Sequence, residues 1–430
     1  MRKKIKNLEQ SRKTVFVGMS GGVDSSVSAA LLKQATPNNF EKLFGRPTPK
    51  GFSGYDVVGV FIKTWHPDFL ACNEEEERRD AMRVAAHLDI PFLTFDFEDV
   101  YKKEVADYMI AEYKAGRTPN PDVMCNKEVK FGAFLKKAIS MGADYVATGH
   151  YAQNKLQSKN SKDFGAFLET RTGHDSENLF IFSLQKAKDP SKDQAYFLWT
   201  LKQEQLSKIL FPVGHLDKTE VRKLARKFNL PVAEKKDSQG ICFLGAVDLK
   251  DFLKHYIKEK KGKVLNEKGE EIGHHSGAVF YTLGERHGFT ITKKNPKDSA
   301  YYVISKDVKK NILVVSQNKN KDSNKNISEK RLVSATGAST RNFLAKKYPC
   351  SFQESFYVNL HNANCISEIP KEAKNYTAQI RYHGELLPCK IKITGKTKAK
   401  IIFKKPVLVA PGQSCVIYDK NACIGGGVIV

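Results

Sequence analysis

A glycine-rich stretch near the start of the chain has the composition of a phosphate-binding turn. The sequence SGGVDSS at residues 20–26 lies between an apolar, β-branched segment at 14–19 and a helix-forming segment at 27–33. Glycines let the backbone approach an anion, and the free N–H groups and the dipole of a helix N-terminus attract it. The stretch lacks the lysine of a Walker A loop and the spacing of a dinucleotide fingerprint. It therefore predicts a phosphate site of another kind.

A second stretch places a cysteine in a polar setting fixed by prolines. The sequence NPDVMC at residues 120–125 follows a helix that we expect to end before Pro119. A loop position near the positive end of a helix, which we expect to begin near Glu128, would lower the pKa of the Cys125 thiol and favour the thiolate. Asp122 could then serve as a base or proton shuttle. The alternative is a turn with an incidental buried cysteine.

A third stretch carries another cysteine between glycines. It is DSQGICFLG at residues 237–245, in which Cys242 has apolar neighbours on both sides. The apolar neighbours leave a core cysteine as an equally good interpretation. Two cysteines on separate loops beside a phosphate site nevertheless suggest a sulfur relay. One cysteine would carry a persulfide, and the other would resolve it and leave a disulfide.

The composition limits the class of protein. The chain has 430 residues, a formal net charge of +24 and a pI near 9.5. This charge predicts a polyanionic partner, although a lysine-biased proteome would produce it equally well. We find no apolar run of membrane-spanning length and no apolar segment of a secretory signal after the charged N-terminus. The eight cysteines form no CxxC pair or zinc-type cluster, so we expect reduced thiols and a cytoplasmic protein without membrane contact.

The first half of the chain must position the glycine-rich turn. Strand patterns at 56–62, 91–95 and 143–148 alternate with helix patterns at 75–87, 100–114 and 131–141. Such alternation predicts an α/β fold with a doubly wound parallel sheet, which binds ligands at the carboxyl ends of its strands.

The rest of the chain changes character. A helical pattern covers roughly 202–227, and short alternating strands recur beyond Gly277, which predicts a C-terminal β-barrel. We expect three domains: a catalytic α/β domain at 1–211, a small helical central domain that carries Cys242 at 212–276, and the barrel at 277–430. Residues 36–55 have the composition of a surface insertion, and the lysine- and asparagine-rich segment 317–329 that of a solvated loop.

Taken together, these stretches resemble a known enzyme family. The glycine-rich turn is similar to the PP-loop of ATP pyrophosphatases, and with its flanks it resembles the nucleotide loop of the tRNA-specific 2-thiouridylases. Further segments of that family are matched in order along nearly the whole chain: AGRTPNPD at 115–122 with Cys125 and Asn126, ATGHY at 147–151, KDQAYFL at 192–198, DSQGICF at 237–243, YTLG at 281–284 and GGG at 425–427.

The resemblance implies an ATP site. The nucleotide would bind the PP-loop and would also touch Ile62 and Gly149; the loop residues are Gly18, Met19, Ser20, Gly21, Gly22, Val23, Asp24 and Ser25. Family members often carry methionine where this chain has Ile62. Mg²⁺ is implied by the ATP chemistry, and Asp24 is the one ligand that we would name.

The resemblance also implies a reaction. The C2 oxygen of a tRNA wobble uridine would be adenylated, and Cys242, loaded as a persulfide by a donor protein, would deliver sulfur to C2. Cys125 would attack the persulfide or release sulfide from it, giving 2-thiouridine, AMP and a Cys125–Cys242 disulfide. Asp122 would act as general acid or base. The sulfur donor would be a cysteine desulfurase or a relay protein.

The tRNA contacts implied by the resemblance lie in three segments: Asn120, Pro121 and Asp122 at the target base; Lys192, Asp193 and Gln194; and Arg381 and Tyr382 in the barrel. A cation beside an aromatic ring suits a splayed anticodon base. The rival interpretations are another PP-loop ligase, which needs no cysteine pair, and a non-catalytic RNA-binding protein, which leaves ATP uncleaved.

Overall fold

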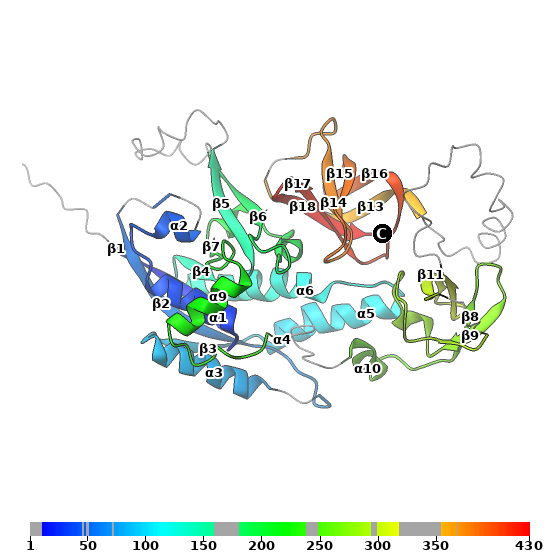
Figure 1. The fold of residues 1–430 in the computed structure, drawn as a ribbon, viewed down its shortest axis with the longest axis horizontal. Coiled ribbons are helices and arrows are strands. Elements are labelled where there is room, and N and C mark those ends of the chain that lie inside the picture. The colour runs from blue at the N-terminus through cyan, green and yellow to red at the C-terminus, as the bar shows by residue number, and fades with distance from the viewer. Residues whose placement is uncertain are drawn as a thin grey trace, which may run out of the picture.

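The computed structural model describes residues 11–44, 47–48, 51–70, 73–158, 180–237, 248–293, 299–317, 354–367 and 369–430. These residues form three parts arranged along the long axis of the molecule (Figure 1). An α/β part stands at the left, a β-barrel in the upper centre, and a smaller sheet at the right. Helix α5 (Tyr108–Lys114) and helix α6 (Pro121–Met124) lie beneath the barrel, between the other two parts.

The α/β part is built on a parallel five-stranded sheet in the order β3-β2-β1-β4-β7. Its strands are β1 (Ser11–Gly18), β2 (Phe52–Lys63), β3 (Phe92–Asp96), β4 (Tyr145–Ala147) and β7 (Ile209–Leu210). The chain places β2 and β3 on one side of β1 and β4 and β7 on the other. The carboxyl end of β1 is therefore a topological switch point, where ligands bind in such sheets. The predicted doubly wound parallel sheet is confirmed.

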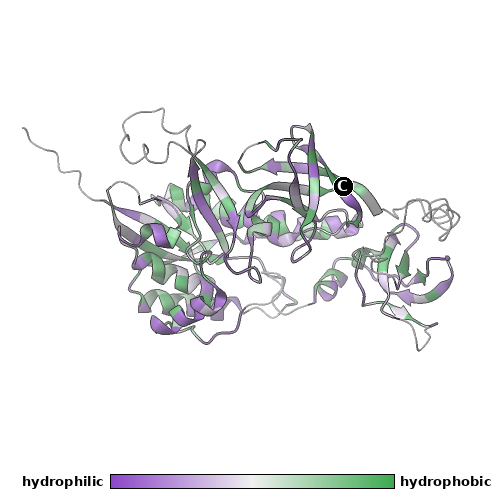
Figure 2. Ribbon diagram, turned by 45° about the horizontal axis from the view of Figure 1, so that its top comes forward, coloured by the Kyte–Doolittle hydropathy of each residue, from purple (hydrophilic) through white to green (hydrophobic). Residues whose placement is uncertain are grey.

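Helices connect and cover these strands. The glycine-rich turn leads into α1 (Val23–Lys33), whose side chains are buried on nearly every side, and α3 (Glu74–His87) follows β2. The remaining helical segments are α2 (Phe40–Phe44), α4 (Glu98–Tyr101), η1 (Lys102–Asp107), η2 (Cys125–Phe134), α7 (Leu135–Ser140), η5 (Ala195–Leu198), α8 (Gln203–Leu206), α9 (Lys218–Lys227), α10 (Leu249–Lys254) and η6 (Ala278–Phe280). In Figure 2 the helices at the left carry a hydrophilic side and a hydrophobic side, as expected for helices that cover a sheet.

The smaller sheet at the right of Figure 1 lies between the other two parts in the sequence, and we call it the middle part. It is mostly strand, whereas we expected a small helical unit. Its five-stranded sheet has the order β10-β9-β8-β12-β11, with the bounds β8 (Gly262–Leu265), β9 (Glu271–His275), β10 (Thr290–Ile291), β11 (Tyr302–Asp307) and β12 (Ile312–Ser316). The strands that we had assigned to the C-terminal barrel at 300–315 pair here instead. Short alternating segments such as 262–265 cannot form a helix with one apolar face, which explains the difference. The proposed domain boundaries at 211 and 276 stay a prediction.

The C-terminal β-barrel is confirmed, and six antiparallel strands close it. They are β13 (Glu354–Cys365), β14 (Tyr376–Gln379), β15 (Leu387–Gly395), β16 (Lys398–Leu408), β17 (Ser414–Asp419) and β18 (Ala422–Ile429). Pairing of β13 with both β16 and β18 closes the ring. A hairpin of β5 (Ala152–Ser158) and β6 (Phe180–Lys186) extends the sheet through β18 and ties the barrel to the α/β part.

Residues 36–55 do not form the surface insertion that we expected. The described residues of this segment contribute an aromatic cluster to the core, in which Phe40 and Phe52 are fully buried and Tyr55 packs on both. The Phe40 and Phe52 rings lie 4.7 Å apart, edge to face. Pro37 and Gly51 lie in turns, but the aromatic side chains of the described part of the segment pack in the core on the β1–β2 side of the sheet. No helix among the described residues is long and apolar enough to cross a membrane.

We expect Phe40→Ala to destabilise the protein by about 3–5 kcal/mol, because a fully buried aromatic side chain leaves a cavity. Urea denaturation followed by intrinsic fluorescence measures the free energy of unfolding. Ile369→Ala is the control: its side chain is 74% exposed, and the expected change stays within about 0.5 kcal/mol. Equal losses in the two variants would show that the segment lies outside the core.

Candidate active site

The glycine-rich turn follows β1 and leads directly into α1. Met19 N–H donates to the Val60 carbonyl at 2.8 Å, which extends the β1–β2 pairing into the turn. Gly21 has a φ of +67°, and a side chain there would collide with the Glu77 carbonyl of α3. Only glycine fits this position, because the left-handed conformation and the close approach both exclude a Cβ.

The first turn of α1 presents backbone N–H groups without a side-chain cap. Gly22 is its N-cap residue and offers no side-chain acceptor. The Ser25 hydroxyl accepts from Ser20 N–H at 3.2 Å, and Ser26 donates to the Gly22 carbonyl at 2.7 Å, so the hydroxyls hold the turn in shape. An open helix N-terminus after a tight turn binds an anion through its N–H groups and its dipole.

Gly149 brings the end of β4 against this turn. A Cβ at Gly149 would lie 2.6 Å from Ser25 N, which is too close for any side chain. Gly18 faces Ile62, with 3.7 Å between a Cβ built at Gly18 and the Ile62 side chain. The structure thus brings together the PP-loop, Ile62 and Gly149, the residues expected at the nucleotide.

A lysine that the sequence analysis missed holds the acidic residue of the turn. Lys218, the first residue of α9, donates to both carboxylate oxygens of Asp24 at 2.7 and 2.9 Å. The Tyr151 hydroxyl donates to Asp24 as well, at 2.8 Å. Burial, and then the Asp24 charge, raises the pKa of Tyr151, so the phenol stays a hydrogen-bond donor at neutral pH.

The same lysine reaches Asp237. The Asp237 carboxylate pairs with Lys218 at 2.9 Å, with Lys192 at 2.9 Å and with Arg222 at 2.5 Å. Burial would raise the pKa of Asp237, but hydrogen bonds from Lys192 and Lys218 outweigh it and lower the pKa well below its usual range. Asp237 is the last described residue before Cys242, which lies outside the described residues. A helical pattern at 202–227 predicts α9, but no local signal predicts that Lys218 and Arg222 meet residues so distant in sequence.

The segment before Cys125 is held by both other parts of the protein. Thr118 N–H donates to the Pro411 carbonyl at 2.8 Å, and Gln413 of the barrel donates to the Thr118 carbonyl at 2.9 Å. The Thr118 hydroxyl lies 3.1 Å from that of Thr282 in the middle part. The backbone is therefore fixed immediately before the candidate catalytic residues.

The structure corrects the setting that we predicted for Cys125. A helix begins at Pro121, not near Glu128, and Asn120 caps it by accepting from Val123 N–H at 3.2 Å. Cys125 lies in the continuous helix α6–η2 and is 3% exposed. The error came from treating Pro121 only as a helix breaker. Proline suits the first helical position because the N–H that it lacks would have no partner there.

The barrel brings Tyr382 to η5, which packs against α6 and η2. The Tyr382 ring lies 4.3 Å from Phe197 and 5.9 Å from Tyr196, between centroids. Burial raises the pKa of Tyr382, and the charges of Asp193 and Asp122 add to the increase. The three segments expected at tRNA therefore meet in one place.

Within the 192–194 segment the side chains already have partners. Asp193 is half-buried and accepts from Ala187 N–H at 2.9 Å and Ala195 N–H at 3.2 Å. Gln194 accepts from Tyr151 N–H at 2.9 Å, and Lys192 pairs with Asp237. This geometry favours a positioning role for Asp193 and Gln194, while direct tRNA contacts of the segment stay a prediction.

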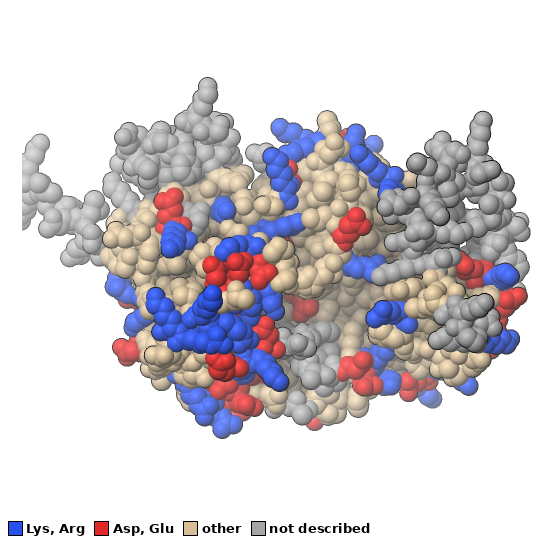
Figure 3. All heavy atoms as spheres, in the orientation of Figure 1, with Lys and Arg blue, Asp and Glu red and all other residues tan. Residues whose placement is uncertain are grey.

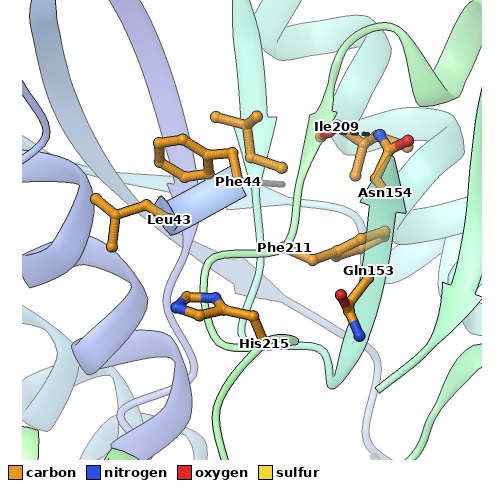
Figure 4. Close-up of a pocket in the computed structure, with 8 residues that line it drawn as sticks. Leu43, Phe44, Gln153, Asn154, Ile209, Phe211 and His215 are labelled. Atoms are coloured by element: carbon orange, nitrogen blue, oxygen red, sulfur yellow. Dashed lines mark hydrogen bonds between the residues drawn. The ribbon is translucent and has the colours of Figure 1, made fainter. Parts of the chain in front are cut away.

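A small pocket lies beside, not in, this site. It is framed by α2, β5 and the chain after β7, and its lining includes His215 and Gln153 (Figure 4). Its free volume of about 20 Å³ suffices for roughly one water molecule and excludes a nucleotide. On the face seen in Figure 3, charges of both signs gather over the α/β part, next to a hollow at the centre of the molecule.

Three family models match successive parts of the chain. A tRNA methyl transferase HUP domain matches residues 13–44 and 51–246, a tRNA methyl transferase PRC-barrel domain matches 250–317, and an aminomethyltransferase beta-barrel domain matches 355–429. The first matches the α/β part, the second the middle sheet and the third the barrel.

Curated relatives match almost the whole chain. The tRNA-specific 2-thiouridylase MnmA of Streptococcus thermophilus is 39% identical over 426 residues, covering 98% of this chain and 96% of that protein. The protein of the same name from Streptococcus pyogenes serotype M3 is 39% identical over 429 residues with the same coverage. Among solved structures, the U34-tRNA thiolase NcsA of Methanococcus maripaludis is 17% identical over 58% of this chain and 65% of its own, with a TM-score of 0.30, which carries no conclusion.

We expect Gly149→Ala to weaken ATP binding about tenfold or more, because its Cβ would push Ser25 and the first turn of α1 away. Isothermal titration calorimetry with ATP measures the effect. Gly395→Ala, in the β15–β16 turn where a Cβ meets only ordinary contacts, is the control. Unchanged ATP affinity in Gly149→Ala would remove this contact from the site.

We expect Lys218→Met to lower the free energy of unfolding by about 1–2 kcal/mol, because it leaves two partly buried carboxylates without their shared cation. A double-mutant cycle with Asp237→Asn tests the pairing. The loss in the free energy of unfolding caused by Lys218→Met should be smaller when Asp237 has already been replaced by asparagine. Lys223→Met, exposed on the same helix, is the matched control. Additive effects of the two changes would contradict the shared pairing.

Proposed function

Because the chain belongs to the family of tRNA-specific 2-thiouridylases, we propose that it replaces the C2 oxygen of the wobble uridine of tRNA with sulfur, using ATP. The observation that carries this function is the convergence of two features at one site. The first feature is the open N-terminus of α1, where Asp24 accepts a hydrogen bond from Tyr151, and Tyr151 N–H donates to Gln194. The second is the segment after Gln194, which contacts Tyr382 and lies close to the Cys125 helix.

ATP is cleaved between its α and β phosphates. The uridine O2 attacks the α-phosphorus, an adenylated O2 forms, and pyrophosphate leaves. The uncapped N–H groups at the start of α1 would bind the phosphates and stabilise the charge that develops on them. No helix dipole or hydrogen-bond donor needs to move during this step, because the turn is fixed by Ser25, Ser26 and Gly21.

Mg²⁺ suits this chemistry because it neutralises phosphate charge. Among the described residues no three His, Cys, Asp or Glu side chains gather to hold a metal ion. Magnesium commonly binds through one or two carboxylates together with substrate phosphates, and Asp24 is the carboxylate of the loop that would serve.

Sulfur then replaces the activated oxygen. Cys242 carries a persulfide, and its outer sulfur attacks C2, so that the C2–O bond breaks and AMP leaves. The Cys125 thiolate attacks the inner sulfur, which forms the Cys125–Cys242 disulfide and leaves the outer sulfur on C2. In the other route Cys125 first releases sulfide from the persulfide, and sulfide attacks C2. Both routes give the same products.

Asp122 is the group placed to move the proton. Asp122 and Cys125 stand three residues apart on one helix, which puts them on the same face. Asp122 takes the proton from the Cys125 thiol and can return it to the leaving group. The thiol is buried, so a nearby base is the means of generating the thiolate.

The reaction requires two macromolecular partners. One is tRNA, held by Asn120, Pro121, Lys192 and the Arg381–Tyr382 loop. The other is a persulfide-carrying protein, a cysteine desulfurase or relay protein, that reloads Cys242. Reduced thiols are needed in each cycle, so we place the reaction in the cytosol, where thiols are kept reduced.

The family models carry the words methyl transferase, so methyl transfer is the competing reaction. A methyl transfer needs a methyl donor and no pair of cysteines, whereas the Cys125 helix is built next to the phosphate site. Mass spectrometry of the product tRNA separates the two, because sulfur for oxygen and an added methyl group change the uridine mass differently.

We expect the protein, incubated with unmodified tRNA, Mg²⁺–ATP and a persulfide donor, to exchange oxygen for sulfur at the wobble uridine. Cys125→Ser and Cys242→Ser should each lower thiolation by more than about a thousandfold, because the nucleophile is lost, while ATP is still cleaved. Cys365→Ser, an exposed cysteine of the barrel, should keep full activity.

Other outcomes would select the rivals. Full product from the double cysteine variant points to another PP-loop ligase, and tRNA binding without ATP cleavage by the intact protein points to an RNA-binding protein. A methyl-sized mass increase that depends on a methyl donor points to methyl transfer.

A further inference from the structure

The β15–β16 side of the barrel carries a run of positively charged residues that contains no acidic residue. Residues 387–408, which form β15 and β16, contain seven lysines and no aspartate or glutamate. Five of the lysines lie at outward positions of these strands, and we call them the lysine track: Lys390, Lys392, Lys398, Lys400 and Lys404.

Strand register arranges these side chains in rows. Lys390 on β15 is opposite Ile402 on β16, which is opposite Tyr357 on β13. In the next row Lys392 is opposite Lys400, which is opposite Asn359. Neighbouring rows alternate with the buried residues Ile391 and Ile401, so the pleat alone directs the lysines outward.

An exposed aromatic side chain lies beside the lysine track. Tyr357 is 46% exposed, and the Lys400 ammonium lies 3.6 Å from its ring centroid. Lysines that neutralise a phosphate backbone beside an aromatic ring that can stack on a base or sugar are the usual elements of an RNA-binding surface. No carboxylate among the described residues forms an ion pair with Lys390, Lys392, Lys398 or Lys404.

The track leads away from the candidate active site. Tyr382 stands just before β15, and the nine residues of β15 carry the strand about 30 Å from that end. Around the barrel, β15 and β16 lie on the opposite side from β17 and β18, which pack against the α/β part through Tyr196 and Trp199. In Figure 3 blue side chains gather at the top of the molecule, where Figure 1 places β15 and β16.

We propose that the lysine track binds the phosphate backbone of the tRNA stem that continues from the base held near Tyr382 and Asp122. The proposal rests on the proposed function and extends it, since it assigns a second tRNA contact that lies outside the catalytic centre. A single-sign positive face gives salt-dependent affinity and a fast encounter with a polyanion.

RNA suits this face better than an acidic protein does. Lysine is depleted from the cores of protein–protein interfaces, which instead bury apolar anchors. Ile402 and Tyr357 are cross-strand neighbours and form one exposed apolar pair next to Lys390 and Lys400. A single pair is much smaller than the apolar patches that mark protein interfaces.

The test is a triple variant, Lys390→Gln, Lys392→Gln and Lys404→Gln, compared with the wild type in tRNA binding over a series of salt concentrations. Each phosphate contact contributes about 0.7–0.9 to the slope of log affinity against log salt, so the slope should fall by about 2–3. The affinity near 0.15 M salt should fall on the order of 10–100-fold. The KM for tRNA should rise, and kcat at saturating tRNA should stay unchanged.

Two controls make the test specific. The triple variant Lys136→Gln, Lys137→Gln and Lys227→Gln removes the same charge from exposed positions on α7 and α9, and it should lose much less affinity. A single-stranded oligonucleotide with the anticodon-loop sequence should bind the wild type and the track variant equally, because it has no stem to reach the track.

Three results would overturn the proposal. Equal losses in both triple variants would reflect net charge alone, and an unchanged tRNA affinity would make the track an ordinary solvated face. Normal tRNA binding with slow turnover only when a protein supplies the persulfide would assign the track to that protein. Absence of thiolation by the wild type would refute the proposed function. The tRNA affinities of the two triple variants would still decide whether the lysine track binds tRNA.

Discussion

The backbone of Thr118 is the point on which the arrangement of the candidate site depends. Its N–H and carbonyl bind the barrel, through Pro411 and Gln413, and its hydroxyl meets Thr282 of the middle part. Two residues later Asn120 caps a helix that carries Asp122 and Cys125. The start of this helix is therefore fixed by two other parts of the protein, the barrel and the middle sheet, and their contacts help to determine where the Cys125 thiol lies.

A second set of interactions joins the nucleotide loop to the remainder of the site. Lys218 has three N–H donors, and its three close contacts are the two oxygens of Asp24 and one of Asp237. Charges that are largely removed from water are stable only when paired, and here one cation pairs with two carboxylates from distant segments. The glycine-rich loop and the segment that precedes Cys242 therefore share a counter-ion, and Tyr151 extends the contact to Gln194.

Local sequence predicts local features of this protein well and distant contacts poorly. The PP-loop, α1 and the parallel sheet follow from glycines, β-branched runs and helical spacing, all of which act over a few residues. Pro121 was misjudged because proline ends a helix in one context and begins one in another. Lys218 and Arg222 look like ordinary residues of a basic helix until the fold brings Asp24 and Asp237 to them. The sequence also did not predict the aromatic cluster of Phe40 and Phe52, because the glycines and prolines around these residues indicated only turns.

The barrel shows how one strand alternation can serve two purposes. Inward positions such as Ile391, Ile401 and Val358 fill its core, while the pleat turns the intervening positions out. On β17 and β18 the outward side meets the α/β part, where Trp199 packs against Gly426, and apolar or small residues are required there. On β15 and β16 the outward side chains Lys390, Lys392, Lys398 and Lys404 are exposed in the part of the chain that the structure describes. If the lysines served only to keep this surface solvated, acidic residues could stand among them. Helix α3 shows such a mixed surface, because it begins with four glutamates and continues with arginines. The absence of any acidic residue from 387 to 408 concentrates the positive potential along one edge of the molecule, which is the distribution that a rigid polyanion can follow from the active site outward.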